Sequence, residues 1–355
     1  MLETPMTELF GVEHPIMLAG ANWITEPKLV SAVSNAGGLA IFATARCTPE
    51  ETRQAIRQIR ELTDKPFGIN QILVGPGAKE NIDVAIEEKV PVINYALGKP
   101  WFIDRVHEYG GKVLGTIALA RHAARAEQLG CDALVITGHE AAAHGADATS
   151  LVLIPIVASR VKIPLIAAGG FYNGRGLAAA LALGADAISM GTRFMLTKES
   201  ILHDNFKQLC LQATEQDTLY STVFDGMPGR ALKTKAAEAM MKGGFPLVEA
   251  FKGASEIKQM LKLSLWQFIR LSFQMMTADE DSSPLWVQAR EAAGSRRHLK
   301  SINNGDLAEG ILFAGQNIGG ISDVPSVQEL IDRIVAEAEE TLEATRGKLV
   351  KKQKV

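Results

Sequence analysis

Three glycines and a threonine follow two short apolar runs of this chain. Gly169 and Gly170 stand directly after one run, and Gly191 and Thr192 stand directly after the next. Because glycine lacks a Cβ, its backbone N–H groups can approach an anion closely, and a threonine hydroxyl adds a donor. These residues indicate a phosphate site, for a nucleotide cofactor or a phosphorylated substrate. A plain turn and a plain strand end are the alternative interpretation.

His144 is a candidate for proton transfer. It lies among small residues, with Glu140 four positions before it. A neutral imidazole near pH 7 can accept or donate a proton, and small neighbours leave room for a planar ligand. His139 is equally available, and a loop histidine is often only a satisfied polar group. The residues alone leave both interpretations open.

Asn22 and Asn70 carry amides that both donate and accept, which suits the edge of a heterocycle. Each asparagine also suits a turn. Trp23 could stack on the ring of a ligand, or it could be a packing residue that fills the mouth of the fold. Arg230 could reach an anion, although we interpret its surroundings, Gly226-Met-Pro-Gly-Arg230, as a turn between helices.

The elements that would position these residues repeat regularly. Eight apolar runs of strand length occur at Pro15–Ala19, Leu39–Ala43, Phe67–Asn70, Val92–Tyr95, Lys112–Thr116, Ala133–Thr137, Leu165–Ala168 and Ala187–Met190. Helical periodicity separates them, as in Pro27–Asn35, Pro49–Leu62, Ala118–Leu129 and Arg175–Leu183. Eight such units of about 20–30 residues predict an α/β fold, a (β/α)8 TIM barrel. Its functional groups gather at the carboxyl ends of the strands, where the candidate residues stand.

Beyond the eight units the rhythm changes, and we predict three parts. A barrel spans 1–204, and a helical substrate or lid domain without strands spans 205–304. The segment 305–355 returns to the barrel and ends in a helix from Ser326 to about Arg346. Within the middle part, Ser264–Met276 is predicted to be a packed amphipathic helix. Gly37, Gly110, Gly130 and Gly184 are expected at helix ends in the left-handed conformation.

Composition excludes several classes. The 355 residues contain 37 Lys and Arg against 40 Asp and Glu, a net charge of −3, which argues against a nucleic-acid partner. The three cysteines are far apart and indicate neither a disulfide framework nor a metal site. No signal-peptide pattern occurs, and no apolar run reaches the roughly 18 residues of a membrane span. We therefore expect a cytoplasmic protein without a membrane partner. The oligomeric state stays open, a homodimer included.

Several motifs resemble one known family. They are Pro15-Ile-Met-Leu-Ala-Gly-Ala-Asn-Trp23, Ser34-Asn-Ala-Gly-Gly-Leu39, Lys65-Pro-Phe-Gly-Ile-Asn70, Glu140-Ala-Ala-Ala-His144, Ile166-Ala-Ala-Gly-Gly-Phe171, Met190-Gly-Thr-Arg-Phe194 and Ala314-Gly-Gln316. Together they resemble the nitronate monooxygenase (2-nitropropane dioxygenase) family over nearly the whole chain. The resemblance extends to the related FMN-dependent enoyl-acyl-carrier-protein reductases and NAD(P)H:quinone reductases.

The resemblance implies an FMN-binding TIM barrel with a helical substrate domain and makes His144 the catalytic residue. It assigns the FMN phosphate to Gly169, Gly170, Met190, Gly191 and Thr192. It assigns the isoalloxazine and ribityl chain to Gly20, Ala21, Asn22, Asn70 and Thr116, with Ala142 packing close and Gln316 contributing.

Two departures from the family pattern stand in the same motifs, and a third concerns Thr116. The family commonly has Gln-Gly-Gly-Met where this chain has Leu18-Ala-Gly-Ala21, and Glu-Ala-Gly-Gly-His where it has Glu140-Ala-Ala-Ala-His144. The added methyl groups narrow a pocket beside a flavin. Some relatives place a lysine where this chain has Thr116, and without that cation an anionic reduced flavin is stabilised less.

The leading prediction is FMN-dependent oxidation of alkyl nitronates by O2 to a carbonyl compound and nitrite. His144 would orient the nitro group, or act as a base on a neutral nitroalkane. The alternative is an NAD(P)H-dependent flavin reductase acting on a quinone or on an enoyl thioester of acyl carrier protein or CoA. Outside flavin chemistry, a phosphate-binding aldolase or isomerase, or a binding protein, also suits the pattern.

Overall fold

A computed structural model describes residues 2–142, 144–242 and 285–349. They form two compact units. The first contains Met1–Glu140, Ala146–Ser200 and Asp323–Val355, and the second contains Ala141–Gly145 and Ile201–Ser322. The predicted helix over Ser264–Met276 lies outside the described residues.

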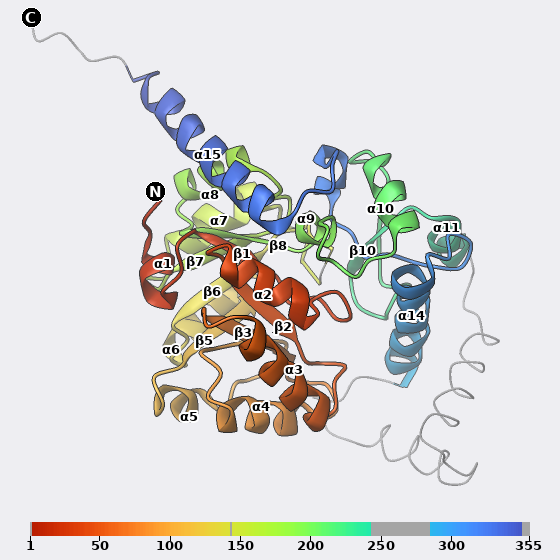
Figure 1. The fold of residues 1–355 in the computed structure, drawn as a ribbon, viewed down its shortest axis with the longest axis horizontal. Coiled ribbons are helices and arrows are strands. Elements are labelled where there is room, and N and C mark those ends of the chain that lie inside the picture. Colours follow the sequence, from red (N-terminus) through yellow and green to blue (C-terminus); the bar gives the residue numbers. More distant parts are fainter. Residues whose placement is uncertain (1, 143, 243–284, 350–355) are drawn as a thin grey trace, which may run out of the picture. The chain divides into compact units, whose positions relative to one another are not determined.

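The first unit is built on a closed barrel of eight parallel strands, β1 to β8 in chain order (Figure 1). The strands are β1 (Ile16–Leu18), β2 (Leu39–Ala43), β3 (Phe67–Ile72), β4 (Val92–Ala96), β5 (Lys112–Ile117), β6 (Ala133–Thr137), β7 (Leu165–Ala168) and β8 (Ala187–Met190). β1 pairs with both β2 and β8, which closes the barrel. The predicted TIM barrel is therefore confirmed.

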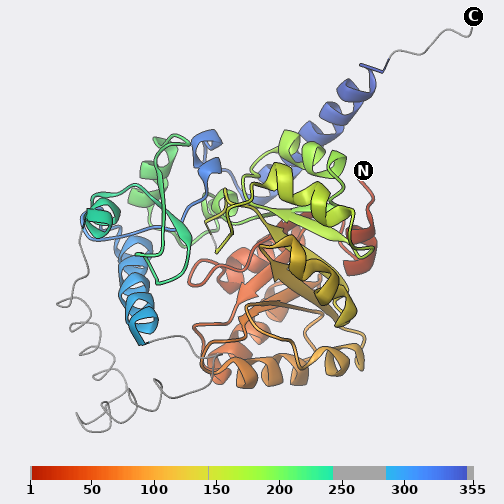
Figure 2. The same cartoon turned by 180° about the vertical axis from the view of Figure 1, so that it is seen from behind.

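Helices surround these strands in both views of the first unit (Figures 1 and 2). They are α1 (Pro5–Phe10), α2 (Pro27–Asn35), α3 (Pro49–Leu62), α4 (Ala78–Glu87), α5 (Ile103–His107), η1 (Ala120–His122), α6 (Ala123–Gln128), α7 (Ser150–Ala158), α8 (Gly174–Ala182), α9 (Thr192–Met195) and α15 (Val327–Arg346). The helical segment predicted over Ala118–Leu129 is confirmed, as a 3₁₀ turn at η1 followed by the α-helix α6. The four glycines predicted at helix ends have φ between +83° and +97°.

The terminal helix α15 packs on α8 through a close backbone approach. A Cβ at Gly174 would lie 2.4 Å from the Ile334 carbonyl oxygen, so only glycine allows this crossing. The Gly174 N–H donates to the Glu337 carboxylate at 2.8 Å. The end of the chain thereby completes the ring of helices around the barrel.

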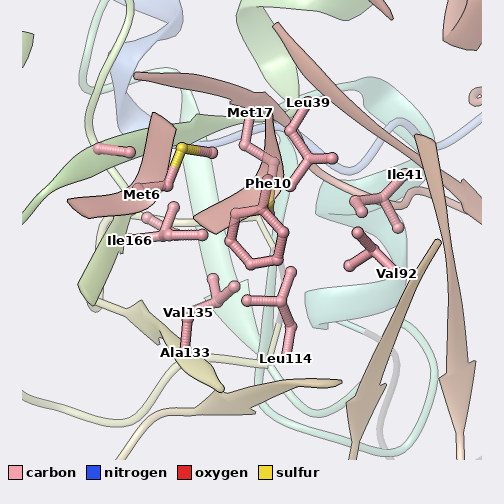
Figure 3. Packing of buried hydrophobic residues seen from close by; sticks show 12 residues of the cluster. Met6, Phe10, Met17, Leu39, Ile41, Val92, Leu114, Ala133, Val135 and Ile166 are labelled. Atoms are coloured by element: carbon pink, nitrogen blue, oxygen red, sulfur yellow. The ribbon is translucent and has the colours of Figure 1, made fainter. Parts of the chain in front are cut away.

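Apolar side chains fill the amino-terminal end of the barrel. Met6 and Phe10 of α1 insert among interior residues near the strand starts, such as Leu39, Val92 and Ala133 (Figure 3). Phe10 is only 5% exposed, and Met6 is fully buried. Burial of one such large side chain stabilises a fold by about 1.5–3 kcal/mol. Helix α1 therefore closes this end of the barrel as a packed core.

The same interior faces become polar toward the strand carboxyl ends. Because side chains alternate along a strand, the interior position two residues after an apolar one is again interior. These later positions are Asn94 after Val92, Thr116 after Leu114, Thr137 after Val135 and Ser189 after Ala187, and Asn70 pairs in register with Asn94. The interior positions of these four strands therefore present hydrogen-bonding groups toward the strand carboxyl ends.

The second unit contains an antiparallel hairpin among helices. Its elements are α10 (Asp204–Leu211), β9 (Thr218–Ser221), β10 (Gly229–Leu232), α11 (Lys235–Lys242), α14 (Leu285–Asn304) and η2 (Gln316–Gly320). Two predictions are wrong here. The region 205–304 does contain strands, and Gly226-Met-Pro-Gly-Arg230 leads from one strand into the next rather than joining two helices. Among the described helices of the whole chain, none has the length and apolarity to cross a membrane.

Candidate active site

Ten of the predicted site residues lie at the carboxyl ends of barrel strands in the first unit. They are Gly20, Ala21 and Asn22 after β1, Asn70 in β3, Thr116 in β5, Gly169 and Gly170 after β7, Met190 at the end of β8, and Gly191 and Thr192 after it. The other three, Ala142, His144 and Gln316, belong to the second unit.

Gly20 and Asn70 are in close contact across the barrel interior. A Cβ at Gly20 would lie 2.8 Å from the Asn70 Cβ and 3.1 Å from Ile41 Cγ2. The Asn70 backbone carbonyl accepts hydrogen bonds from the Thr44 N–H and hydroxyl, both at 2.9 Å. Glycine after β1 is therefore required for Asn70 to occupy its place at the end of β3.

Three buried polar atoms at this end have no hydrogen-bond partner among the described residues: Asn22 Oδ1, Asn70 Oδ1 and Ser189 Oγ. Leaving such an atom buried and unpaired costs about 1–3 kcal/mol. Clusters of such groups mark places where a ligand supplies the missing partners. Sequence reasoning missed Ser189, because a serine inside a buried strand resembles any other strand residue.

Sequence reasoning also missed Asn94, whose side-chain amide is hydrogen-bonded to the Thr116 hydroxyl. The Asn94 Nδ2 donates to Thr116 Oγ1 at 2.9 Å and to the Leu114 carbonyl at 3.2 Å, and the Thr116 hydroxyl lies 3.2 Å from Asn94 Oδ1. The two side chains form a neutral amide–hydroxyl pair. The pair is a donor and acceptor surface without charge.

The loop after β7 carries two consecutive left-handed glycines. Gly169 and Gly170 have φ of +97° and +87°. Glu140 supports this loop: a Cβ at Gly170 would lie 3.5 Å from Glu140 Cβ, and the Glu140 carboxylate accepts from the Ser150 N–H and hydroxyl. The Ser150 hydroxyl lies 2.8 Å from the Gly169 carbonyl oxygen. Glu140 therefore holds loop structure rather than serving as a free carboxylate.

Arg193 anchors the segment that begins at Gly191. Its guanidinium is 2% exposed and donates to the Asp323 carboxylate at 3.1 Å and to the Leu196 carbonyl at 2.9 Å. Burial lowers the pKa of Arg193, and the nearby Asp323 charge opposes that effect. At Gly191 itself, a Cβ would meet no described atom closer than 3.9 Å, that of Ala19. The Arg193 hydrogen bonds therefore fix the segment, while the space beside the Gly191 Cα stays open.

In the second unit, His144 is held by the turn that leads into β10. Its Nδ1 lies 3.0 Å from the Pro228 carbonyl oxygen, and its Nε2 lies 3.6 Å from Asp225 Oδ2. A carbonyl only accepts, so Nδ1 carries the hydrogen of this contact, and the ring's other nitrogen is Nε2. The neighbouring backbone is held too, since Ala142 O accepts from the Arg230 N–H at 3.1 Å and Gly145 O from the Tyr220 hydroxyl at 2.8 Å.

The other histidines near these segments have different surroundings. His139 Nδ1 lies 3.2 Å from the Ala146 carbonyl oxygen in the first unit. His298 is fully buried beside Phe313, and burial lowers the pKa of His298 to about 4. It is therefore neutral near pH 7 and belongs to the core of the second unit. Gln316 begins η2 in that unit.

The barrel residues fit a polar ligand that brings both donors and an anionic group. Asn22 Oδ1 and Asn70 Oδ1 require donors, and the backbone at Gly169, Gly170 and Gly191 can approach an anion closely. Within the described parts of the chain, no cluster of three or more His, Cys, Asp or Glu side chains could hold a metal ion. The arrangement points to an organic ligand with a phosphate.

Comparisons with known proteins show the family to which the chain belongs. A model of the nitronate monooxygenase family matches residues 3–81 and 71–337. Over 347 residues, 97% of this chain and 98% of the relative, the chain is 39% identical to the (3aS,4S,5R,7aS)-5-hydroxy-7a-methyl-1-oxo-octahydro-1H-indene-4-carboxyl-CoA dehydrogenase of Rhodococcus jostii. It is 29% identical to a probable nitronate monooxygenase of Staphylococcus saprophyticus over 287 residues, 67% of this chain and 81% of the relative.

A solved structure extends the similarity to the fold. FabK from Thermotoga maritima matches with a TM-score of 0.80 and 35% identity, over 98% of this chain and 100% of that chain. Both the family model and the full-length relative cover the barrel and the second unit. The chain belongs to the nitronate monooxygenase family of oxidoreductases, whose members in general depend on a flavin.

Proposed function

We propose that this protein is an FMN-dependent oxidoreductase that transfers a hydride between an acyl-CoA thioester and its flavin, with His144 exchanging the accompanying proton. The observation that carries the proposal is the 39% identity to a carboxyl-CoA dehydrogenase over almost the full length of both chains. The match to the nitronate monooxygenase of Staphylococcus is weaker and covers two thirds of this chain. Similarity that includes the second unit favours a shared class of substrate.

The barrel residues suit FMN by their chemistry. FMN, when bound, supplies the two-electron centre that accepts or returns a hydride. The backbone at Gly169, Gly170 and Gly191 would hold the phosphate, with the Thr192 hydroxyl beside it. The acceptors Asn22 Oδ1 and Asn70 Oδ1 would receive donors of the cofactor, which ends their unpaired state. The remaining barrel residues that would line the FMN site are Gly20, Ala21, Thr116 and Met190.

His144 is the acid–base residue in this proposal, and Ala142 and Gln316 contribute to its surroundings. When the substrate is oxidised, one of its C–H bonds gives up a hydride, and a proton leaves a neighbouring atom. The proton goes to His144 Nε2, because Nδ1 already donates to the Pro228 carbonyl. In the reverse direction, Nε2 returns a proton to the substrate.

Nitronate oxidation is the second candidate, favoured by the family model and by the Staphylococcus relative. An alkyl nitronate would react with O2 to give a carbonyl compound and nitrite. This candidate has the weaker support, because the match to the probable nitronate monooxygenase is 29% identical over two thirds of this chain, against 39% over almost the full length for the dehydrogenase.

Anaerobic stopped-flow mixing separates the candidates. We expect the FMN-loaded protein to lose its visible flavin absorbance with an acyl-CoA thioester, or with NAD(P)H followed by recovery on an enoyl-CoA. If neither the acyl-CoA thioester nor NAD(P)H lowers the flavin absorbance, and the protein releases nitrite from propionate 3-nitronate under air, nitronate oxidation replaces the proposal. A protein that stays colourless after incubation with FMN would overturn both.

The role of His144 is tested with a matched histidine. We expect His144→Gln to lower kcat at least 100-fold, as loss of a general acid–base group does. His139→Gln, five residues earlier, removes an imidazole whose Nδ1 lies 3.2 Å from the Ala146 carbonyl oxygen, and should retain activity within about twofold. Equal losses in the two variants would assign the effect to loop folding instead of proton transfer.

A further inference from the structure

A carboxylate accompanies His144 in the second unit. Asp225 Oδ2 lies 3.6 Å from His144 Nε2, on the ring atom opposite the one that faces Pro228. The Asp225 side chain is 13% exposed, against 27% for His144. The carboxylate is therefore sheltered, whereas the imidazole keeps a larger exposed edge.

The position of Asp225 is fixed by its own turn. Its second oxygen, Oδ1, accepts from the Met227 N–H at 3.1 Å. The same turn supplies the Pro228 carbonyl that holds His144 Nδ1. One short segment thus contacts both nitrogens of the ring, through a backbone carbonyl on one side and a carboxylate on the other.

These two contacts have different consequences for a proton. The Pro228 carbonyl fixes the hydrogen on Nδ1, so a proton gained by the imidazole goes to Nε2. The positive charge that results then lies beside the Asp225 carboxylate, and opposite charges at such a distance attract appreciably when partly shielded from water. A neutral ring receives no comparable stabilisation from Asp225.

We propose that Asp225 is a positioning residue that orients His144 and stabilises its protonated form during turnover. This inference rests on the proposed role of His144 as the acid–base group. The proton itself stays between substrate and His144 Nε2, and Asp225 remains a carboxylate throughout. At 3.6 Å the carboxylate is too far to take a hydrogen bond from Nε2, so it attracts the charge of the ring while the single Nε2 site stays available to the substrate.

The sharpest variant is Asp225→Asn, which is nearly isosteric. The amide oxygen can still accept from the Met227 N–H, so the turn keeps its hydrogen bond while the charge is lost. We expect kcat to fall at least tenfold, with KM and FMN content within about twofold of wild type. Asp225→Glu restores the charge and should recover part of the loss.

Asp217 provides a matched control in the same unit. Its carboxylate accepts from the Thr214 N–H and hydroxyl, both at 2.8 Å. Asp217→Asn removes one negative charge from a loop without touching the turn at Asp225. It should leave kcat within about twofold. A loss in Asp217→Asn as large as that in Asp225→Asn would mean a nonspecific charge effect and would overturn the proposal.

Nitrogen-15 NMR of histidine-labelled protein tests the contact without turnover. The resonances of His144 are identified by their absence in His144→Gln. At one fixed pH, Asp225→Asn should move the Nε2 resonance while Nδ1 keeps the shift of a protonated nitrogen, and Asp217→Asn should move neither. An Nε2 resonance unchanged in Asp225→Asn overturns the proposal.

The two measurements separate the possible failures. If wild-type protein turns over neither acyl-CoA nor nitronate but Nε2 responds to Asp225→Asn, the proposed function fails while the pairing stands. If wild-type protein is active and Asp225→Asn matches it in kcat, the proposed function stands and Asp225 has no positioning role.

Discussion

The two ends of the barrel interior differ in chemistry although the same strands build both. At the amino-terminal end, Met6 and Phe10 pack among Leu39 and Val92 (Figure 3). At the carboxyl end, Asn70 keeps a buried oxygen without a partner among the described residues. One end is filled by apolar side chains of the chain itself, and the other carries a buried polar atom that a ligand could pair.

This contrast shows how one element serves stability and binding at once. Along β4, Val92 contributes to the apolar core, and Asn94, two residues later, is part of the polar layer. One strand therefore contributes to both layers, through different residues. Substitutions at the two ends should therefore separate into losses of stability and losses of cofactor affinity.

Phe10→Ala should give the largest effect on stability. Truncating a buried phenylalanine costs about 3–5 kcal/mol, from lost burial and the cavity left behind. Chemical denaturation of the FMN-free protein measures this loss. The control Leu62→Ala, at a side chain 51% exposed, should cost under about 1 kcal/mol. A Phe10→Ala protein as stable as the control would show that α1 does not close the barrel.

Adding FMN should stabilise wild type and Phe10→Ala by equal amounts. A ligand at 100 times its Kd contributes about 2.7 kcal/mol to the free energy of unfolding. If the two ends are independent, the increment is the same in both proteins, within about 0.5 kcal/mol. Denaturation with and without FMN gives the increments. A much smaller increment in Phe10→Ala would mean that the packed end also determines the shape of the site.

Gly20→Ala should lower both stability and cofactor affinity, because its methyl group contacts Asn70 directly. The new Cβ would lie 2.8 Å from Asn70 Cβ, and the strain of such overpacking costs about 1–3 kcal/mol. We expect FMN affinity, measured by fluorescence quenching, to fall at least tenfold as well. Gly75→Ala, where the methyl would meet only the Ile72 carbonyl at 3.4 Å, is the control. Normal FMN affinity in Gly20→Ala would contradict the assigned site.

Asn70→Ala should give the smallest and most selective effect. It removes a buried oxygen that has no partner among the described residues, so the FMN-free protein should keep its stability within about 1 kcal/mol. FMN affinity should fall about tenfold, since one hydrogen bond to the cofactor is lost. Titration with FMN measures the change. A protein destabilised by several kcal/mol with unchanged affinity would place Asn70 among the structural residues instead.

Much of the first unit could be predicted from local sequence. Four strands, β2, β6, β7 and β8, begin and end where the apolar runs do. A strand of a parallel sheet is buried on both faces, so its whole length is apolar and its ends coincide with the ends of the run. The capping box at Thr48 and Glu51 likewise determines where α3 begins.

Other features carried no local signal. β9 is half-buried along its length and has no apolar alternation to reveal it. Asn94 and Ser189 are polar residues within strands, and only the barrel register shows that both face the interior. Asp225 gave no signal because its significance depends on His144, far away along the chain.

The sequence by itself determined the barrel, the glycines at its strand ends and the family of the chain. These follow from periodicity, from backbone freedom at glycine and from motifs, all of which are local properties. Only the tertiary structure decided which polar atoms stay unpaired and that the Pro228 carbonyl meets a histidine 84 residues earlier. Such contacts arise from chain closure and strand register, which bring distant residues together without marking either one in the sequence.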